Sequence, residues 1–295
     1  LNPGTFVIIN LLGGVALLLW GVRMVRTGVL RAWGDRLKHF IEVRLGNRGS
    51  AFLSGAMATA ILGSGTATTL IVAGIAASGA IGTSLGLAVL LGADVGSAIV
   101  SALFASGSSF AIWASPILIF AGYVTFSVSR EFRPHNIGRI MIGLGLMLMS
   151  LHLISVATAP LREASLFHAV LTAIGHEPML AFLTGAILAW GFHSTLAVIL
   201  LIASFVANGS LELGGALAFI LGLNLGGGLP AISSTLALPP AGRRLPVANL
   251  MCRSIAALIG LAFIERIADW ATLLPFDAVT VALTFHAALN LAIGL

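Results

Sequence analysis

The chain has 295 residues, of which 58% are hydrophobic and only 8% are charged, and its mean hydropathy is +1.07. A soluble domain carries roughly 25% charged residues, so this composition excludes a soluble globular enzyme, a disordered chain and a nucleic-acid-binding protein. The formal net charge is +5, and the single cysteine, Cys252, excludes a disulfide framework and a multi-cysteine metal site. What remains is a membrane protein that crosses the bilayer several times.

The apolar runs predict helical spans, because they continue for about 18 or more residues without the alternation that marks transmembrane strands. We therefore expect an all-α polytopic membrane protein. The predicted spans lie near residues 5–22, 84–105, 110–129, 136–158, 212–237, 247–265 and 271–295.

Residues 23–48 have a different pattern, because they hold seven of the 15 basic residues. Apolar residues such as Leu30, Trp33 and Leu37 recur between them at helical spacing. This pattern predicts an amphipathic helix on an anionic membrane surface. We therefore interpret residues 1–50 as a first transmembrane helix followed by an interfacial helix.

Two further segments, 51–78 and 181–208, are rich in Gly, Ala, Ser and Thr, and a polar cluster interrupts each near its middle. Each is about 28 residues long, which exceeds the roughly 20 residues of a straight span. We expect both to form re-entrant hairpins of two half-helices that meet at the polar cluster.

The two segments belong to an internal repeat with a constant offset of 130 residues. Across 52–96, 15 of 45 positions are identical to 182–226 without a gap. The offset aligns Ser64 with Ser194 and the Gly-x-Asp-x-Gly stretch 92–96 with the Gly-x-Asn-x-Gly stretch 222–226. We assign 51–129 to repeat 1, 130–180 to a connecting transmembrane helix and outer loop, and 181–295 to repeat 2.

The loop charges predict that the repeats have opposite orientations. If residues 23–50 lie in the cytoplasm and both hairpins return to the side they enter from, most remaining basic residues of the loops also fall inside. The two hairpins then enter from opposite faces of the membrane, which is the inverted-repeat architecture of many secondary transporters.

The polar clusters read Gly63-Ser64-Gly65-Thr66 and His193-Ser194-Thr195-Leu196. Free backbone N–H groups at a half-helix start carry partial positive charge, and Ser or Thr hydroxyls can donate to the same anion. No Lys or Arg lies in either cluster, so we expect an anion site without a buried cation. The alternative is that the small residues serve only close helix packing.

Polar residues outside the clusters predict a cation site. Asp94 and Asn224 are equivalent in the repeat, and an ionisable group within an apolar run is costly and usually functional. Asp94 could hold Na⁺ or take up a proton; the alternative is a wet interfacial position. His193 could donate to a substrate or respond to pH, and Asn290 could line a central cavity.

The motifs give the chain a resemblance to the bacterial sodium-dependent phosphate cotransporters, which are relatives of the animal type II Na⁺/phosphate cotransporters. Members of that family carry Gln-Ser-Ser-Ser-Ala in each of two inverted repeats, with Gly-x-Asn-x-Gly about 30 residues later. Here Gly63 and His193 replace both glutamines, Asp94 replaces the first asparagine, and Gly227-Gly228 stands where threonines are usual. The stretch 285–290, Phe-His-Ala-Ala-Leu-Asn, is similar to another family motif.

The resemblance implies a phosphate site and a Na⁺ site built from the repeat motifs. The expected substrate-binding residues are Ser64, Gly65, Thr66, His193, Ser194, Thr195 and Asn224. The expected cation-binding residues are Thr68, Thr69, Asp94, Asn224 and Asn290.

The sequence and the resemblance together predict Na⁺-coupled symport of inorganic phosphate across the bacterial inner membrane by alternating access, and neither an enzyme nor a cofactor. The expected partners are inorganic phosphate, Na⁺ and membrane lipids, without nucleic acid; whether the chain forms a homo-oligomer stays open. The alternatives are the same fold carrying another oxyanion or coupled to H⁺, an anion channel, and an intramembrane serine protease.

Overall fold

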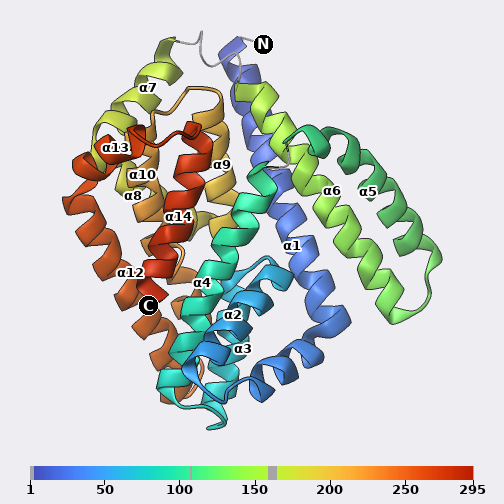
Figure 1. Ribbon diagram of the computed structural model, residues 1–295. Coiled ribbons are helices and arrows are strands. Elements are labelled where there is room, and N and C mark those ends of the chain that lie inside the picture. Colours follow the sequence, from blue (N-terminus) through green and yellow to red (C-terminus); the bar gives the residue numbers. More distant parts are fainter. Residues whose placement is uncertain (1–2, 107, 159–164, 295) are drawn as a thin grey trace.

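The computed structural model describes residues 3–106, 108–158 and 165–294, and within these ranges the chain is helical without strands (Figure 1). Five of the helical stretches are long and apolar enough to cross a membrane. They are 8–43, 83–105, 132–157, 213–235 and 240–262. The expectation of an all-α membrane protein is therefore confirmed.

The N-terminal span does not end where we expected. α1 (Pro3–Val43) is one helix of 41 residues, so the first span and the basic amphipathic segment are continuous. Its glycines allow α6 (Phe132–Thr158) to approach closely: a Cβ on Gly21 would meet the carbonyl oxygen of Gly143, and one on Gly28 would meet that of Asn136. α6 packs in turn against α5 (Ser108–Val128), which lies at the outer edge of the molecule (Figure 1).

Each expected hairpin consists of two helices separated by a break. In the first, α2 (Arg48–Leu62) leads into α3 (Gly65–Ala77), and α4 (Thr83–Ser106) follows. In the second, α8 (Pro178–Phe192) leads into α9 (Thr195–Ala207).

The expected span 212–237 is divided into two helices at Gly227-Gly228, and the expected span 271–295 is divided near its start. A short helix also lies in the connection 159–180. These remaining helices are α7 (Ser165–His176), α10 (Leu213–Gly226), α11 (Leu229–Thr235), α12 (Pro240–Ala262), α13 (Ile264–Thr272) and α14 (Ala278–Gly294).

Glycine contacts tie each hairpin to the helix that follows it, and they recur at the offset of 130 residues. A Cβ on Gly92 of α4 would overlap the carbonyl group of Phe52 in α2, and one on Gly222 of α10 would overlap that of Phe182 in α8. Four more glycines make equivalent contacts, namely Gly55 with Gly185 and Gly96 with Gly226. The two halves of the chain therefore share the same tight crossing between backbones.

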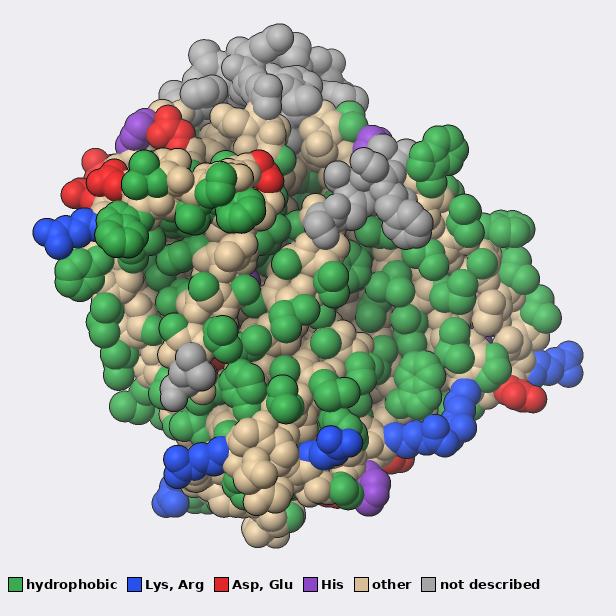
Figure 2. Space-filling view, viewed as in Figure 1, with side chains coloured by type: hydrophobic (Ala, Val, Ile, Leu, Met, Phe, Trp, Pro, Cys, Tyr) green, Lys and Arg blue, Asp and Glu red, His purple; other side chains and the backbone are tan. Residues whose placement is uncertain are grey.

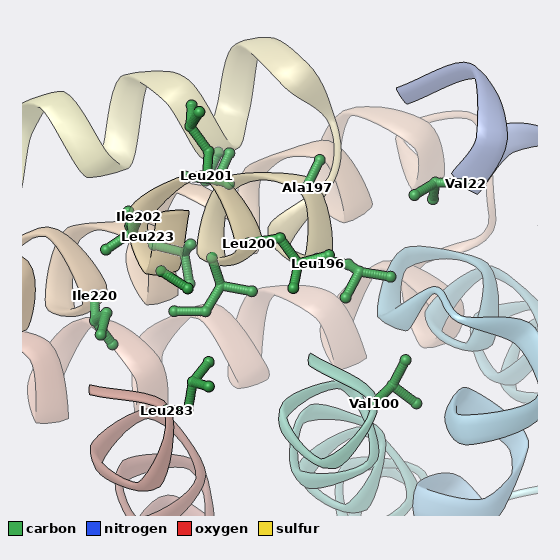
Figure 3. Close-up of a cluster of buried hydrophobic side chains, with 14 of the residues drawn as sticks. Val22, Val100, Leu196, Ala197, Leu200, Leu201, Ile202, Ile220, Leu223 and Leu283 are labelled. Atoms are coloured by element: carbon green, nitrogen blue, oxygen red, sulfur yellow. The ribbon is translucent and has the colours of Figure 1, made fainter. Parts of the chain in front are cut away.

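α9 lies at the centre of the molecule and has no polar face. Nine of its 13 residues are buried. Figure 3 shows its side chains Leu196, Leu200 and Ile202 meeting apolar residues from several other helices. A helix that is apolar all round belongs inside a large core or a membrane.

The outer surface carries a broad hydrophobic band between charged edges (Figure 2). Lys and Arg side chains gather along the lower edge in this view, and most of the visible acidic side chains lie at the upper left. Exposed basic residues occur at the end of α1, in the α5–α6 connection and at the start of α12. The surface is that of a protein embedded in a bilayer.

The glycine crossing predicts a stability difference between two glycine-to-alanine variants. Gly92→Ala forces α2 and α4 apart and is expected to cost about 1–3 kcal/mol, as overpacking does. Gly74→Ala in α3 is the matched control, because a Cβ there meets nothing within 4 Å. Thermal unfolding in detergent measures both, and equal midpoints for the two variants would contradict the crossing.

Candidate functional site

The two hairpins break at equivalent residues. Gly63 ends α2 in the left-handed region, with φ 60° and ψ 21°, and His193 ends α8 with φ 53° and ψ 28°. A second equivalent pair, Gly79 and Gly209, also has positive φ. His193 is the single non-glycine residue with positive φ in the described part of the chain, which is an unfavourable conformation for a residue with a Cβ.

A serine caps the second half-helix of each hairpin. Ser64 Oγ accepts a hydrogen bond from the amide of Ala67 at 3.3 Å, and Ser194 Oγ accepts from the amide of Ala197 at 3.2 Å. The other amides of the first turn have no partner within their own helix. Both serines, predicted as substrate ligands, therefore face the start of their own half-helix.

The starts of α3 and α9 meet at one small cavity. Gly65 and Thr66 reach it from α3, and Thr195 reaches it from α9. Ser97 of α4 lies beside Thr195, with 3.4 Å between their hydroxyl oxygens. The cavity has a volume of about 20 Å³, enough for about one water molecule, so its walls must separate before a larger anion can enter.

A buried ion pair forms another wall of this cavity. Arg253 of α12 places Nε 3.1 Å from Asp94 Oδ2 of α4, and Asn249 Nδ2 donates to the same oxygen at 3.0 Å. Asp94 is 7% exposed and Arg253 is 5% exposed. Asp94 was predicted to bind a cation, and in this conformation a guanidinium occupies that role.

The two glycines between α10 and α11 make room for these groups. A Cβ on Gly227 would collide with the methyl group of Thr195. A Cβ on Gly228 would lie 2.8 Å from Leu250 Cδ1 and 3.5 Å from Arg253 Nη1. Gly227 thus leaves room for Thr195 in the cavity wall, and Gly228 leaves room for Leu250 next to Arg253.

The predicted cation ligands divide between the cavity and other places. Thr69 lines the cavity with Asp94, whereas the Thr68 hydroxyl lies 2.7 Å from that of Thr59 inside the first hairpin. Asn224 and Asn290 are buried and do not line the cavity. Among the described residues, neither polar atom of the Asn224 amide has a hydrogen-bond partner, nor does Asn290 Oδ1.

A larger pocket of about 480 Å³ lies beside the small cavity and shares Thr66 with it. It is lined by His193 at the break of the second hairpin and by Arg26 and Arg31 of α1. The predicted ligand His193 is thus exposed at this pocket rather than at the small cavity. Within the described ranges, no group of three His, Cys, Asp or Glu side chains could hold a metal ion.

The residues that sequence reasoning missed are Ser97, Asn249 and Arg253. Arg253 lies within an apolar helix, and a charged residue there is a functional candidate by position alone. The expectation of an anion site without a buried cation is wrong, because it rested on the absence of Lys and Arg from the two hairpin clusters and Arg253 comes from another helix. Arg253 reaches the cavity from α12, 159 residues beyond its partner Asp94 in the sequence.

A model of the Na⁺/Pi-cotransporter family matches residues 17–156 and 162–285. The chain belongs to this family. It is 34% identical over 284 residues to "Putative inorganic phosphate export protein YjbB" of Escherichia coli K12 and 35% identical to the protein of the same name in Salmonella typhimurium. These matches cover 96% of the chain and 52% of each relative, so the chain spans about half the length of the YjbB proteins.

A more distant relative is "Uncharacterized protein YqeW" of Bacillus subtilis, 23% identical over 258 residues, which are 88% of this chain and 83% of that protein. No solved structure matches the chain. The resemblance noted from the hairpin motifs is therefore confirmed.

The buried ion pair predicts a non-additive effect on stability. Arg253→Gln leaves the Asp94 carboxylate buried without its cation, which is expected to cost about 3–5 kcal/mol. Adding Asp94→Asn removes the stranded charge and is expected to restore more than half of the loss. Unfolding midpoints of the two single variants and the double variant measure the coupling; Arg266→Gln, at an exposed residue, is the control. If the stability losses of the two single variants simply add in the double variant, Asp94 and Arg253 do not interact as this pair.

The left-handed conformation of His193 predicts a second difference. His193→Ala and His193→Gly both remove the imidazole, but glycine adopts positive φ without the Cβ penalty of about 1–2 kcal/mol. The glycine variant should therefore be the more stable of the two in a thermal unfolding assay. A more stable alanine variant would argue against this backbone conformation.

Proposed function

We propose that the chain is a secondary active transporter that carries inorganic phosphate across the cell membrane together with Na⁺, by alternating access. The observation that carries this proposal is the meeting of two half-helix starts, those of α3 and α9, at one cavity with the hydroxyls of Thr66 and Thr195. Family membership supports phosphate as the substrate.

The cavity has the chemistry that an oxyanion requires. The unpaired first-turn amides of a helix carry partial positive charge, and they bind phosphate oxygens without a full charge on the protein. The hydroxyls of Thr66 and Thr195 add donors that can orient to the anion. Two such helix starts facing one another would hold opposite sides of a tetrahedral anion.

The half-helices support the proposal that both hairpins are re-entrant. α2 has 15 residues and α3 has 13, which correspond to roughly 22 and 20 Å at 1.5 Å per residue. Each is shorter than the hydrocarbon core of about 30 Å, so the break would lie inside the membrane. The recurring glycine contacts support two repeats, and the basic edge in Figure 2 supports their opposite orientation.

Na⁺ would bind near the same cavity through oxygen ligands. Asp94 and Thr69 line the cavity, and the amide oxygens of Asn224 and Asn290 are buried without hydrogen-bond partners among the described residues. A buried polar atom without a partner is costly, and a bound cation would satisfy such oxygens. A bound Na⁺ also lowers the cost of moving an anion through a low-dielectric interior.

Access would alternate between a closed and an open cavity. The pocket beside Thr66 would become the path to the cavity when the walls between them separate, and Arg26 and Arg31 would attract anions into it. Motion of one repeat against the other would close this path and open the opposite one.

Two versions of this function, uptake and export of phosphate, differ in the direction of transport. An inward Na⁺ gradient drives uptake by symport, whereas the printed name of the YjbB relatives says phosphate export. The alternatives of another oxyanion or of H⁺ coupling keep the same site and change only the cargo.

The test is uptake of radiolabelled phosphate into proteoliposomes with and without an inward Na⁺ gradient. Saturable, Na⁺-dependent uptake is expected for the wild type. Thr66→Val and Thr195→Val each remove one donor to the anion and should lower uptake by about 10- to 100-fold, since a hydrogen bond to a charged group contributes about 1.5–3 kcal/mol.

Thr125→Val is the matched control, because Thr125 lies in α5 and its hydroxyl donates to Ala121 within the same helix. Uptake that follows an H⁺ gradient instead would change the coupling ion, and efflux from loaded vesicles alone would favour export. Absence of phosphate movement under every gradient would reject phosphate as the substrate.

A further inference from the structure

We propose that Arg253 is a substrate-binding residue and that Asp94 holds its guanidinium until Na⁺ arrives, so that an exchange of partners within this ion pair couples the two solutes. This inference rests on the proposed function. Na⁺ would pair with the Asp94 carboxylate, and the released Arg253 guanidinium would pair with phosphate.

The geometry leaves most of the guanidinium unused. Arg253 places Nε 3.1 Å from Asp94 Oδ2, and that contact is not aligned as a hydrogen bond. Among the described residues, neither Nη atom has a hydrogen-bond partner. Nε is fully enclosed by protein, whereas the two Nη atoms are not. Both belong to a side chain that lines the cavity. Once Na⁺ releases the guanidinium from Asp94, its two outer nitrogens can therefore bind an anion in a fork, as Arg does with phosphate.

The surrounding residues fit an anion at this position. Gly228 borders this position, because a Cβ on it would lie 3.5 Å from Nη1, in ordinary van der Waals contact. Thr66, Thr195 and the starts of α3 and α9 line the same cavity from the hairpins. The arginine thus adds a full positive charge to a group of partial charges and hydroxyls that already favours an anion.

Charge balance explains why the binding of one solute would require the other. If phosphate drew Arg253 away without Na⁺, the Asp94 carboxylate would remain buried with only Asn249 as a partner. A buried charge that loses its partner is strongly unfavourable. With Na⁺ on Asp94, each buried charge of the pair again has a partner of opposite sign, so Na⁺ should raise the affinity for phosphate by about 10- to 100-fold, within the usual range of coupling between sites.

Asp94→Asn tests the exchange directly, because it removes the charge and keeps an oxygen that can accept from Asn249. Binding of radiolabelled phosphate to the purified chain in detergent is measured with NaCl and with choline chloride. In the wild type, Na⁺ should lower the Kd by about 10- to 100-fold. In Asp94→Asn, the Kd without Na⁺ should approach the wild-type value with Na⁺, and the Na⁺ effect should fall below about 3-fold.

Arg253→Lys is the second variant and keeps the positive charge while removing the fork. It should weaken phosphate binding by about 10-fold or more in NaCl. Asp269→Asn, at an exposed residue of α13, is the control for loss of a carboxylate and should leave the Na⁺ effect at the wild-type value.

The outcomes separate this inference from the proposed function. If the wild type shows Na⁺-dependent phosphate binding and Asp94→Asn keeps the full Na⁺ effect, the exchange is wrong and the cotransporter function stands. If Arg253→Lys binds phosphate with the wild-type affinity, Arg253 is not part of the phosphate site. If the ion pair has only a structural role, Asp94→Asn will lower the unfolding midpoint without changing the effect of Na⁺ on phosphate binding. If the wild type binds no phosphate under either condition, the proposed function itself fails.

Discussion

The structure depends on one constraint, which is that a broken helix in an apolar molecule must have its free backbone groups sheltered by protein. In lipid, an unsatisfied N–H or C=O costs several kcal/mol. The breaks at Gly63 and His193 release such groups twice. Ser64 and Ser194 satisfy part of them, and the surrounding helices enclose the rest. The groups left over at the starts of α3 and α9 are then available to a ligand, so the same constraint that shapes the hairpins also creates the candidate site.

To enclose the free backbone groups at the helix breaks, the surrounding helices must pack more closely than ordinary side chains allow. The glycines at Gly92 and Gly222 let backbones touch where any Cβ would overlap a carbonyl group. These contacts hold α2 against α4 and α8 against α10, and they place both half-helix starts in the interior. Gly227 acts differently, because it leaves space for the side chain of Thr195, which lines the cavity. Small residues therefore serve packing in one place and access to the cavity in the other.

The buried Asp94–Arg253 pair is energetically costly. Two charges at 7% and 5% exposure give up hydration, and well-packed apolar residues would often be at least as stable. The pair adjoins the candidate anion cavity and Asn249 supports it. Its position gives it a use that stability alone does not explain, because a neutral pair can release one charge of each sign when solutes of both signs arrive.

The sequence by itself determined the membrane class, the approximate spans, the repeat and the residues at the hairpin breaks, because these depend on composition, run length and a constant offset along the chain. It did not predict that α1 continues through its basic segment to Val43 or that a break follows Gly226. Arg253 was the main omission: it lies in an apolar helix far from Asp94 in sequence, with no spacing that links the two. Only the tertiary structure decided that pairing, because it depends on how α12 packs against α4. Local pattern specifies the helices and their breaks, whereas long-range packing decides which buried charges become neighbours.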